Sequence, residues 1–161
     1  MNATRQGALL PYGDLIPPWV LERARDFFAF GLNYLPLTLS TTQTQAFAVD
    51  GDADFLLTCI SGFATSAAAP QTEQATIPAL ISISDTGSGR LFQNTPLHIE
   101  NLIGSGQLPG FLPYPKLIPA ASVVSVTLTS LDAAASWNIR LAFSGFKIFP
   151  FPENPPRGMR R

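Results

Sequence analysis

Charged side chains are scarce in this sequence. Asp, Glu, Lys and Arg make up 13% of the 161 residues, about half of the roughly 25% usual for globular domains. The net charge is −1, and the one basic feature is a short C-terminal arginine group, which argues against nucleic-acid binding through a basic surface. A chain with so few charges has little to cover its surface with, so we expect neighbouring subunits to cover much of it.

Cysteine and histidine each occur once. The single cysteine, Cys59, excludes an intrachain disulfide and a cysteine-based zinc cluster. Its place in the apolar run DFLLTCI predicts a buried structural thiol. His98 is the one histidine available as a base for a Ser-His-Asp or Cys-His mechanism, and no serine stands in a glycine elbow. We therefore predict a protein that is not an enzyme and that has no cofactor. No bound metal is predicted either, except that one alternative at Asp50, Asp52 and Asp54 stays open, as described below.

Long apolar runs are missing as well. No apolar stretch reaches the roughly 18 residues needed to span a bilayer. The first residues, MNATRQGALLPYGD, lack the apolar core of a signal peptide. We expect a chain that assembles in the cytoplasm and does not associate with a membrane.

A glycine-rich segment, DTGSG at residues 85–89, resembles a phosphate-binding loop at first sight. Such a loop needs four residues between its two glycines, then Lys and Ser or Thr, with a helix behind it. Here Gly87 and Gly89 are two positions apart, no lysine follows, and Pro96 keeps the next residues from being helical. We predict a hairpin turn, in which Asp85 accepts nearby backbone N–H groups and the glycines supply positive φ.

Three aspartates alternate in VDGDADF, namely Asp50, Asp52 and Asp54. An EF-hand loop requires glycine at its sixth position and glutamate at its twelfth. Here Gly51 is second and Ser61 is twelfth, so the match fails. Two interpretations stay open: a polar turn that leads into a strand, or a calcium site of another kind at an oligomer interface.

Alternation of apolar and polar residues is the main structural signal. Runs around Ile77–Ile83, Val124–Leu128 and Trp137–Phe143 have a period of two, which predicts strands with one buried face. The last two runs are joined by DAAAS and are expected to form a hairpin, with a bulge at Gly145 where the alternation slips. No long helical pattern occurs in this zone. The predicted fold is all-β, a single β-sandwich or jelly roll of seven or eight strands.

Two further segments are assigned by their composition. DFLLTCISGF is apolar on both faces and is expected to be a central strand, whereas the Thr-rich LTLSTTQTQAFAV is expected at an edge or at a subunit contact. NLIGSGQLPGFLPYPKLIPAAS, with four prolines and three glycines, reads as a long irregular connection. Its apolar side chains either fold back over an open end of the sandwich or pack on a neighbouring subunit.

We divide the chain into an N-terminal arm (1–36), a β-sandwich domain (37–149) and a Pro/Arg-rich C-terminal tail (150–161). The segment PPWVLERARDFFAF in the arm is compatible with a short helix beginning at Pro17 or Pro18, or with an extended arm. Aromatic residues in arms and loops are the type that anchors interfaces. The predicted interface residues are Trp19, Phe27, Phe28, Phe30, Phe111, Tyr114 and Phe151.

The order of several motifs resembles a family of small virion structural proteins of tailed bacteriophages. These motifs are GLNYLPL, a Thr/Gln-rich strand, DADF, SGRL, LPYPKLIP and a final LAFSGFK, spread over roughly residues 28–149. The resemblance implies a role in assembly, most simply as a capsid cement or decoration protein. Its partners would then be the major capsid protein and copies of itself in the virion. The alternative is a tail or fibre component with a receptor- or glycan-binding β-sandwich, in contact with other tail or fibre proteins.

Overall fold

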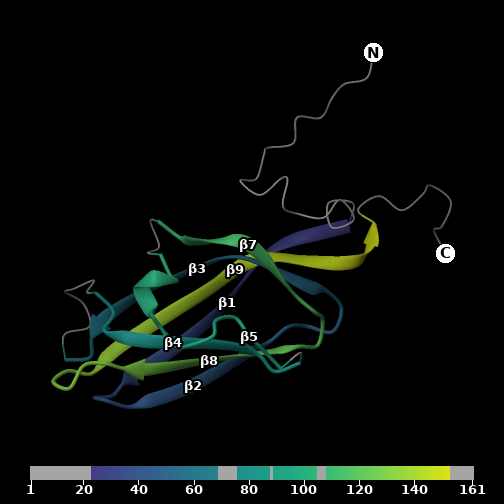
Figure 1. The fold of residues 1–161 in the computed structure, drawn as a ribbon. Helices are drawn as coiled ribbons and strands as arrows, with labels where there is room; N and C mark the ends of the chain where they lie inside the picture. The colour runs from purple at the N-terminus through teal and green to yellow at the C-terminus, as the bar shows by residue number, and fades with distance from the viewer. Residues whose placement is uncertain (1–22, 69–75, 88, 105–107, 153–161) are drawn as a thin grey trace.

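The computed structural model describes residues 23–68, 76–87, 89–104 and 108–152. These residues form two antiparallel β-sheets packed face to face, with a single turn of 3-10 helix and no α-helix among them (Figure 1). The elements are β1 (Arg23–Leu37), β2 (Thr42–Ala48), β3 (Asp54–Ser66), β4 (Ala79–Asp85), β5 (Arg90–Leu91), β6 (Leu97–His98), η1 (Ile99–Asn101), β7 (Gly110–Ile118), β8 (Val123–Ser130) and β9 (Trp137–Pro152).

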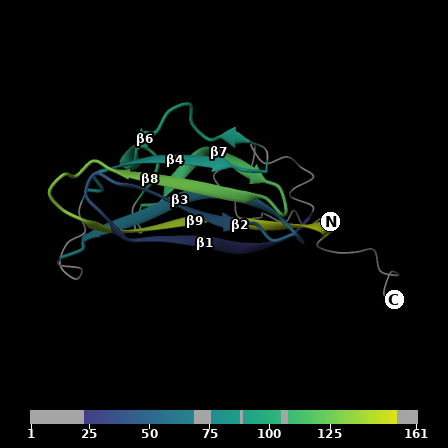
Figure 2. The ribbon, with the colours of Figure 1, turned by 90° about the horizontal axis from the view of Figure 1, so that it is seen from below.

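The strand order differs strongly from the sequence order. One sheet, called sheet A here, has the order β1-β9-β3-β7, and the other, sheet B, has the order β2-β8-β4-β5, with β6 also paired to β4. Figure 2 shows β4 and β8 in one layer and β1 and β9 in the other. The first four strands therefore alternate between the two sheets. The predicted all-β sandwich is confirmed at this level.

The core lies between the two layers and follows the predicted alternation. In β8 the buried side chains are Val124, Val126 and Leu128, while the residues between them are partly exposed. In β4, Ile81 and Ile83 are fully buried. β3 is buried on both faces from Phe55 to Ile60 and lies between β9 and β7, as predicted for a central strand. The Thr-rich β2 lies at an edge of sheet B.

The predicted hairpin between residues 123–130 and 137–149 is wrong. β8 pairs with β2 and β4, whereas β9 pairs with β1 and β3, so residues 131–136 carry the chain from one sheet to the other. The carboxylate of Asp132 organises this crossing, because it accepts N–H groups from Ala134 (2.7 Å), Ala135 (3.0 Å) and the Trp137 indole (2.8 Å). These hydrogen bonds, the one from Ala134 foremost, hold the pKa of Asp132 below its usual value.

The expected boundary of the N-terminal arm also needs correction. Residues 23–36 are part of β1, which pairs with β9 without interruption from Arg25 to Tyr34, and they do not form a helix. The physical reason is a period of two: Leu32 and Tyr34 are buried, whereas Gly31 and Asn33, which alternate with them, are exposed. Residues 1–22 and 153–161, which hold the rest of the expected arm and most of the expected tail, lie outside the described residues.

The connection expected to be irregular contains strand β7. Gly110–Ile118 pairs with β3 despite Pro113 and Pro115. Proline lacks an N–H and is tolerated in a sheet where that group would face outward or where the strand bulges. β7 meets both conditions, since it is an edge strand of sheet A and its register with β3 shifts between Leu57 and Cys59.

The slip expected at Gly145 is a bulge in the neighbouring strand. Leu57 pairs with Gly145 and Cys59 with Ser144, which leaves Thr58 as the extra residue of β3. A Cβ on Gly145 would lie 2.0 Å from the carbonyl oxygen of Leu56, so only glycine fits against the bulge. Beyond it, Leu56 and Ile148 are buried in a second small apolar cluster, against Leu117 and Phe146.

Candidate assembly surface

Three predicted anchors are exposed aromatic side chains on the two edge strands of sheet A. Phe27 on β1 is 69% exposed, and Phe111 and Tyr114 on β7 are 58% and 71% exposed. The Phe27 ring is not isolated, because it meets the ring of Phe146 edge-on at 6.1 Å. Aromatic rings left in water on a folded domain are typical of a surface that binds another molecule.

Two other predicted anchors face the core. Phe28 and Phe30 are partly buried and pack against the main cluster. Phe30 stacks on Phe47 of sheet B at 4.4 Å, and the ammonium group of Lys147 lies 4.0 Å from the ring centre of Phe28. These rings hold β1 to the sandwich. Trp19 lies outside the described residues, as does the side chain of Phe151.

The outer face of sheet A has small, uncharged residues at its centre. Next to Phe27 on the same face of β1 are Ala29 and Gly31, which pair with Ser144 and Ala142 of β9. The Arg140 guanidinium lies on the Phe63 ring, 5.5 Å from its centre. Exposed sheet faces normally have many more charges. A face of this kind loses little hydration when a partner covers it.

A side-chain clip covers one part of the β1 edge. The amide oxygen of Gln45 accepts the N–H of Asn33 (3.1 Å), and the Gln45 amide nitrogen donates to the Asn33 carbonyl. Gln43 donates from its amide nitrogen to the carbonyl of Pro36 (2.8 Å). The Gln45 amide therefore makes both bonds that a neighbouring strand would make at Asn33. Sequence reasoning missed this clip because it joins residues from different sheets.

The clip shows which way the β1 backbone groups point. Since Asn33 bonds to Gln45, its N–H and C=O face away from β9, and the register with β9 is regular from Arg25 to Tyr34. In an antiparallel ladder this orientation repeats at every second residue. The backbone groups of Arg25, Phe27, Ala29 and Gly31 therefore face outward too. All four residues are exposed, and within the described part of the chain no strand pairs with this edge.

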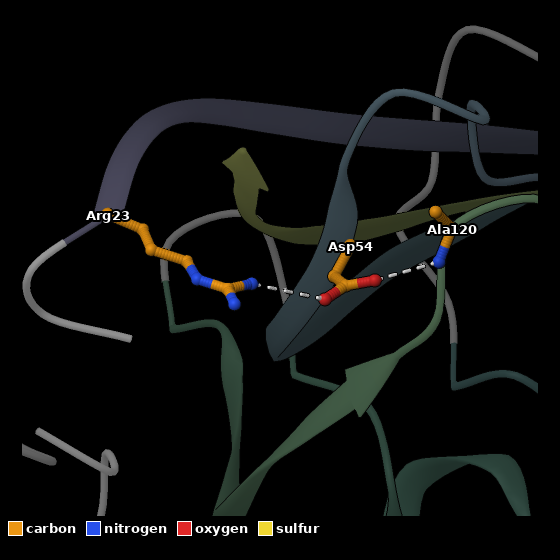
Figure 3. A network of polar contacts seen from close by, with 3 residues as sticks. All are labelled: Arg23, Asp54 and Ala120. Atoms are coloured by element: carbon orange, nitrogen blue, oxygen red, sulfur yellow. Dashed lines mark hydrogen bonds and ion pairs between the residues drawn. The ribbon is translucent and has the colours of Figure 1, made fainter. Parts of the chain in front are cut away.

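The three alternating aspartates do not converge on a common point. Asp54 accepts the Ala120 N–H (2.9 Å) and is 3.8 Å from the guanidinium of Arg23 (Figure 3). Asp50 forms an ion pair with Lys147, and Asp52 is exposed. In the described ranges, no three His, Cys, Asp or Glu side chains come together as metal ligands would. The geometry agrees with a polar turn that leads into β3.

The glycine-rich segment is a hairpin turn, as predicted. β4 pairs with β5, with Asp85 opposite Arg90, and Asp85 accepts the N–H of Gly87 at 2.9 Å. Of the two glycines, Gly89 has the positive φ, 64°. His98 is half-buried on β6, and Cys59 is buried on β3, as expected of a structural thiol. None of the helical segments that the structure describes is long and apolar enough to cross a membrane.

Comparison with known proteins assigns no family. No protein-family model matches the chain, no curated protein matches it, and no solved structure matches it. The features that bear on function are therefore those of the fold itself: small, uncharged residues at the centre of the outer face of sheet A, exposed aromatic rings, and an open strand edge.

Proposed function

We propose that this protein is a structural subunit that acts by binding other subunits, as a capsid cement protein in the virion of a tailed bacteriophage. Its partners are the major capsid protein and copies of itself. The observation that carries the proposal is the outer surface of sheet A, where exposed Phe27 and Phe111 flank small uncharged residues. The residues between these rings are small and carry no charge, namely Ala29, Gly31, Ala142 and Ser144.

We also propose that the sandwich is a jelly roll. The orders β1-β9-β3-β7 and β2-β8-β4-β5 support this, because the first four strands alternate between the sheets and each sheet combines early and late strands. Jelly rolls built from two such Greek keys occur in viral capsid and lectin domains. This is an argument from fold analogy, which raises the expectation of a virion role without assigning it.

The mechanism is mass action. Apolar surface removed from water contributes about 25 cal/mol per Å², and a partner that binds only the assembled state stabilises that state. A subunit that contacts two shell proteins at once holds them together without any chemical step. The low charge of the chain favours this role, because few ions have to lose their hydration when the surface is covered.

The copy number of this chain in purified particles tests the proposal. Quantitative mass spectrometry should give a ratio to the major capsid protein near one, or a simple fraction such as one third. A few to a few dozen copies per particle would move the chain to the tail or fibres, and absence from particles would overturn the proposal. Because β1 begins at Arg23, deletion of residues 1–22 tests the arm separately, and it should weaken attachment while the sandwich stays folded.

One observation favours a second function. Tyr114 is 71% exposed on β7, and exposed aromatic side chains on lectin-like sandwiches are suited to stacking against sugar rings. In this alternative the chain is a receptor- or glycan-binding module of a tail or fibre. A glycan array distinguishes the two functions: specific binding that Tyr114→Ala removes supports the module, and the absence of binding supports cement.

A further inference from the structure

The open edge of β1 has a defined length. At one end Gln45 occupies the bonding positions of Asn33, and at the other the register with β9 shifts between Arg23 and Arg25. Between these limits the N–H and C=O groups of Arg25, Phe27, Ala29 and Gly31 face outward. Natural edge strands are usually protected by proline, bulges or inward-facing charges. Residues 25–31 contain no proline and no bulge, and their one charge on the core-facing side, Asp26, lies near the N-terminal end of the segment.

This edge is complementary to itself. In antiparallel pairing, outward-facing residues must meet outward-facing residues. If two copies pair around a two-fold axis at Phe28, Arg25 lies opposite Gly31 of the other copy and Phe27 lies opposite Ala29. This arrangement uses every outward-facing backbone group from 25 to 31. Registers centred on Arg25 or Asp26 would instead place like charges opposite each other and leave part of the edge unpaired.

The side chains fit the same register. On the outer face, the exposed Phe27 ring of one copy would cover Ala29 and Gly31 of the other, so a large side chain meets two small ones. Cross-strand contacts of this kind stabilise sheets, and an aromatic ring over a glycine compensates for the missing side chain. A Cβ built on Gly31 meets nothing within 4 Å, so this place is open within the described chain.

We infer that β1 pairs with β1 of a second copy, antiparallel and centred on Phe28, so that sheet A continues across a two-fold dimer. Main-chain hydrogen bonds supply the affinity, as in other cases of strand addition. The inference deepens the proposed function, because it specifies how copies of the chain contact each other. It can nevertheless be tested with the purified full chain alone, without particles.

Association of the full chain, followed by analytical ultracentrifugation over a range of concentrations, tests the edge. Ala29→Pro removes the N–H at the centre of the interface in both copies and leaves the ladder with β9 intact, since that N–H faces outward. Loss of two hydrogen bonds should raise the dimer dissociation constant about thirtyfold. Wild-type protein that stays monomeric at all concentrations, or an Ala29→Pro variant that dimerises as well as wild type, would overturn the inference.

Ala46→Pro is the matched control. Val49 donates to Ser122 and Ser130 donates to Thr41, each at 2.8 Å, so the odd-numbered residues of β2 face β8 and Ala46 faces outward. Ala46 is thus an exposed alanine on the open edge of the other sheet. This variant should dimerise like wild type. If Ala46→Pro abolishes the dimer and Ala29→Pro does not, β2 is the pairing edge and the inference is wrong.

Disulfide trapping tests the register and does not depend on proline being tolerated. The double variant Phe27→Cys/Ala29→Cys places two cysteine pairs opposite each other across the axis, at a separation suited to a disulfide. It should form a covalent dimer under mild oxidation. In Phe27→Cys/Gly31→Cys the two cysteines do not lie opposite each other in this register, so this variant should not form a covalent dimer. The wild type is the control for cross-linking through Cys59. Equal cross-linking of both double variants would contradict the register centred on Phe28.

The two proposals fail in different experiments. If the chain dimerises through β1 but is absent from particles, the dimer inference is supported and the proposed function is contradicted. If the chain is abundant in particles but monomeric when purified, and does not cross-link at positions 27 and 29 in the particles, the proposed function is supported and the dimer inference is contradicted.

Discussion

The two edges of sheet A differ in how they meet solvent. β7 contains Pro113 and Pro115, and its register with β3 is irregular. A strand added at this edge would find no N–H donor at the two prolines and no regular strand to pair with. β1 on the opposite edge is regular from Arg25 to Tyr34 and has no proline in that range. Proline and bulges are usual means of preventing edge-to-edge association. The difference indicates that one edge is blocked and the other is kept available.

The protection on β1 is local. Gln45 covers the backbone at Asn33, and Gln43 covers the carbonyl of Pro36, so only the half of the strand nearer its C-terminal end is blocked. A folding unit that only avoided aggregation would gain from blocking the whole edge. We therefore interpret the remaining open segment as a binding element with a set length, and the following predictions test that comparison from the largest expected effect to the smallest.

Both edge strands of sheet A are held in place by the central strands β3 and β9. Gly145→Ala, which changes the contact between these two strands, should have the largest effect on stability. The added Cβ would lie 2.0 Å from the Leu56 carbonyl oxygen at the bulge, so β3 and β9 must separate. We expect a loss of about 3 kcal/mol or more in unfolding free energy, measured by urea denaturation. The matched control is Gly31→Ala on the open edge, which should change stability by less than about 1 kcal/mol. Similar losses for both variants would contradict the assigned bulge.

Tyr34 anchors β1 to the opposite sheet, and Tyr34→Phe should have a smaller effect. Its buried hydroxyl donates to the Val126 carbonyl at 2.6 Å, so the variant should lose about 1 kcal/mol of unfolding free energy near neutral pH. Burial raises the pKa of Tyr34, so the folded state holds this proton more tightly than the unfolded state. Wild-type stability should then fall as the pH rises above about 10, and its advantage over Tyr34→Phe should shrink. A constant difference up to high pH would contradict the buried hydroxyl.

Gln45→Ala should lengthen the open edge. The variant releases both backbone groups of Asn33 to water, and we expect a cost of about 0.5–1 kcal/mol together with faster amide hydrogen exchange at Asn33. Thr44→Ala is the control, since it removes only the hydroxyl contact with Thr127 on the outer face (2.8 Å). Exchange at Asn33 that is the same in both variants would show that the clip does not form in solution.

Opening the second edge should leave stability almost unchanged and alter the size of the assembly. Pro113→Val/Pro115→Val restores two N–H donors on β7, with a stability change within about 0.5 kcal/mol. Association at both edges no longer closes at a dimer, so light scattering should detect larger species at high concentration. If the double variant stops at the same size as wild type, the prolines are not what blocks β7.

The sequence predicted the buried faces better than the pairing of strands. Alternation in residues 79–85 and 123–130 identified the core positions, because a strand with one buried face has a period of two whatever its partners are. The pairing of β8 and β9 could not be obtained in this way, since a six-residue connection suits a hairpin and a crossing between sheets equally well. β7 was missed because its prolines argue against a strand unless the strand lies at an edge.

The candidate surface was predictable in part. Aromatic content predicted Phe27, Phe111 and Tyr114 as interface residues, and all three are exposed. It also predicted Phe28 and Phe30, but these two pack against the core. Alternation along β1 separates Phe27 from the other two, and this signal was masked by the interpretation of the leader as an arm or helix. The open edge itself depends on hydrogen bonds between Gln45 and Asn33, twelve residues apart and in different sheets, which no local pattern encodes.

The Gln45 clip also sets up an exchange reaction. A strand that pairs with residues 25–31 ends next to Asn33, whose backbone groups are bonded to the side-chain amide of Gln45 and not to another strand. Displacing that amide exchanges two hydrogen bonds for two others and leaves every strand of the sandwich in place. Branch migration on nucleic acids proceeds in this way, with a free toehold that binds first and a covered segment that is released afterwards. In this protein the released group is a single glutamine, so pairing at this edge can grow by one step without any unfolding.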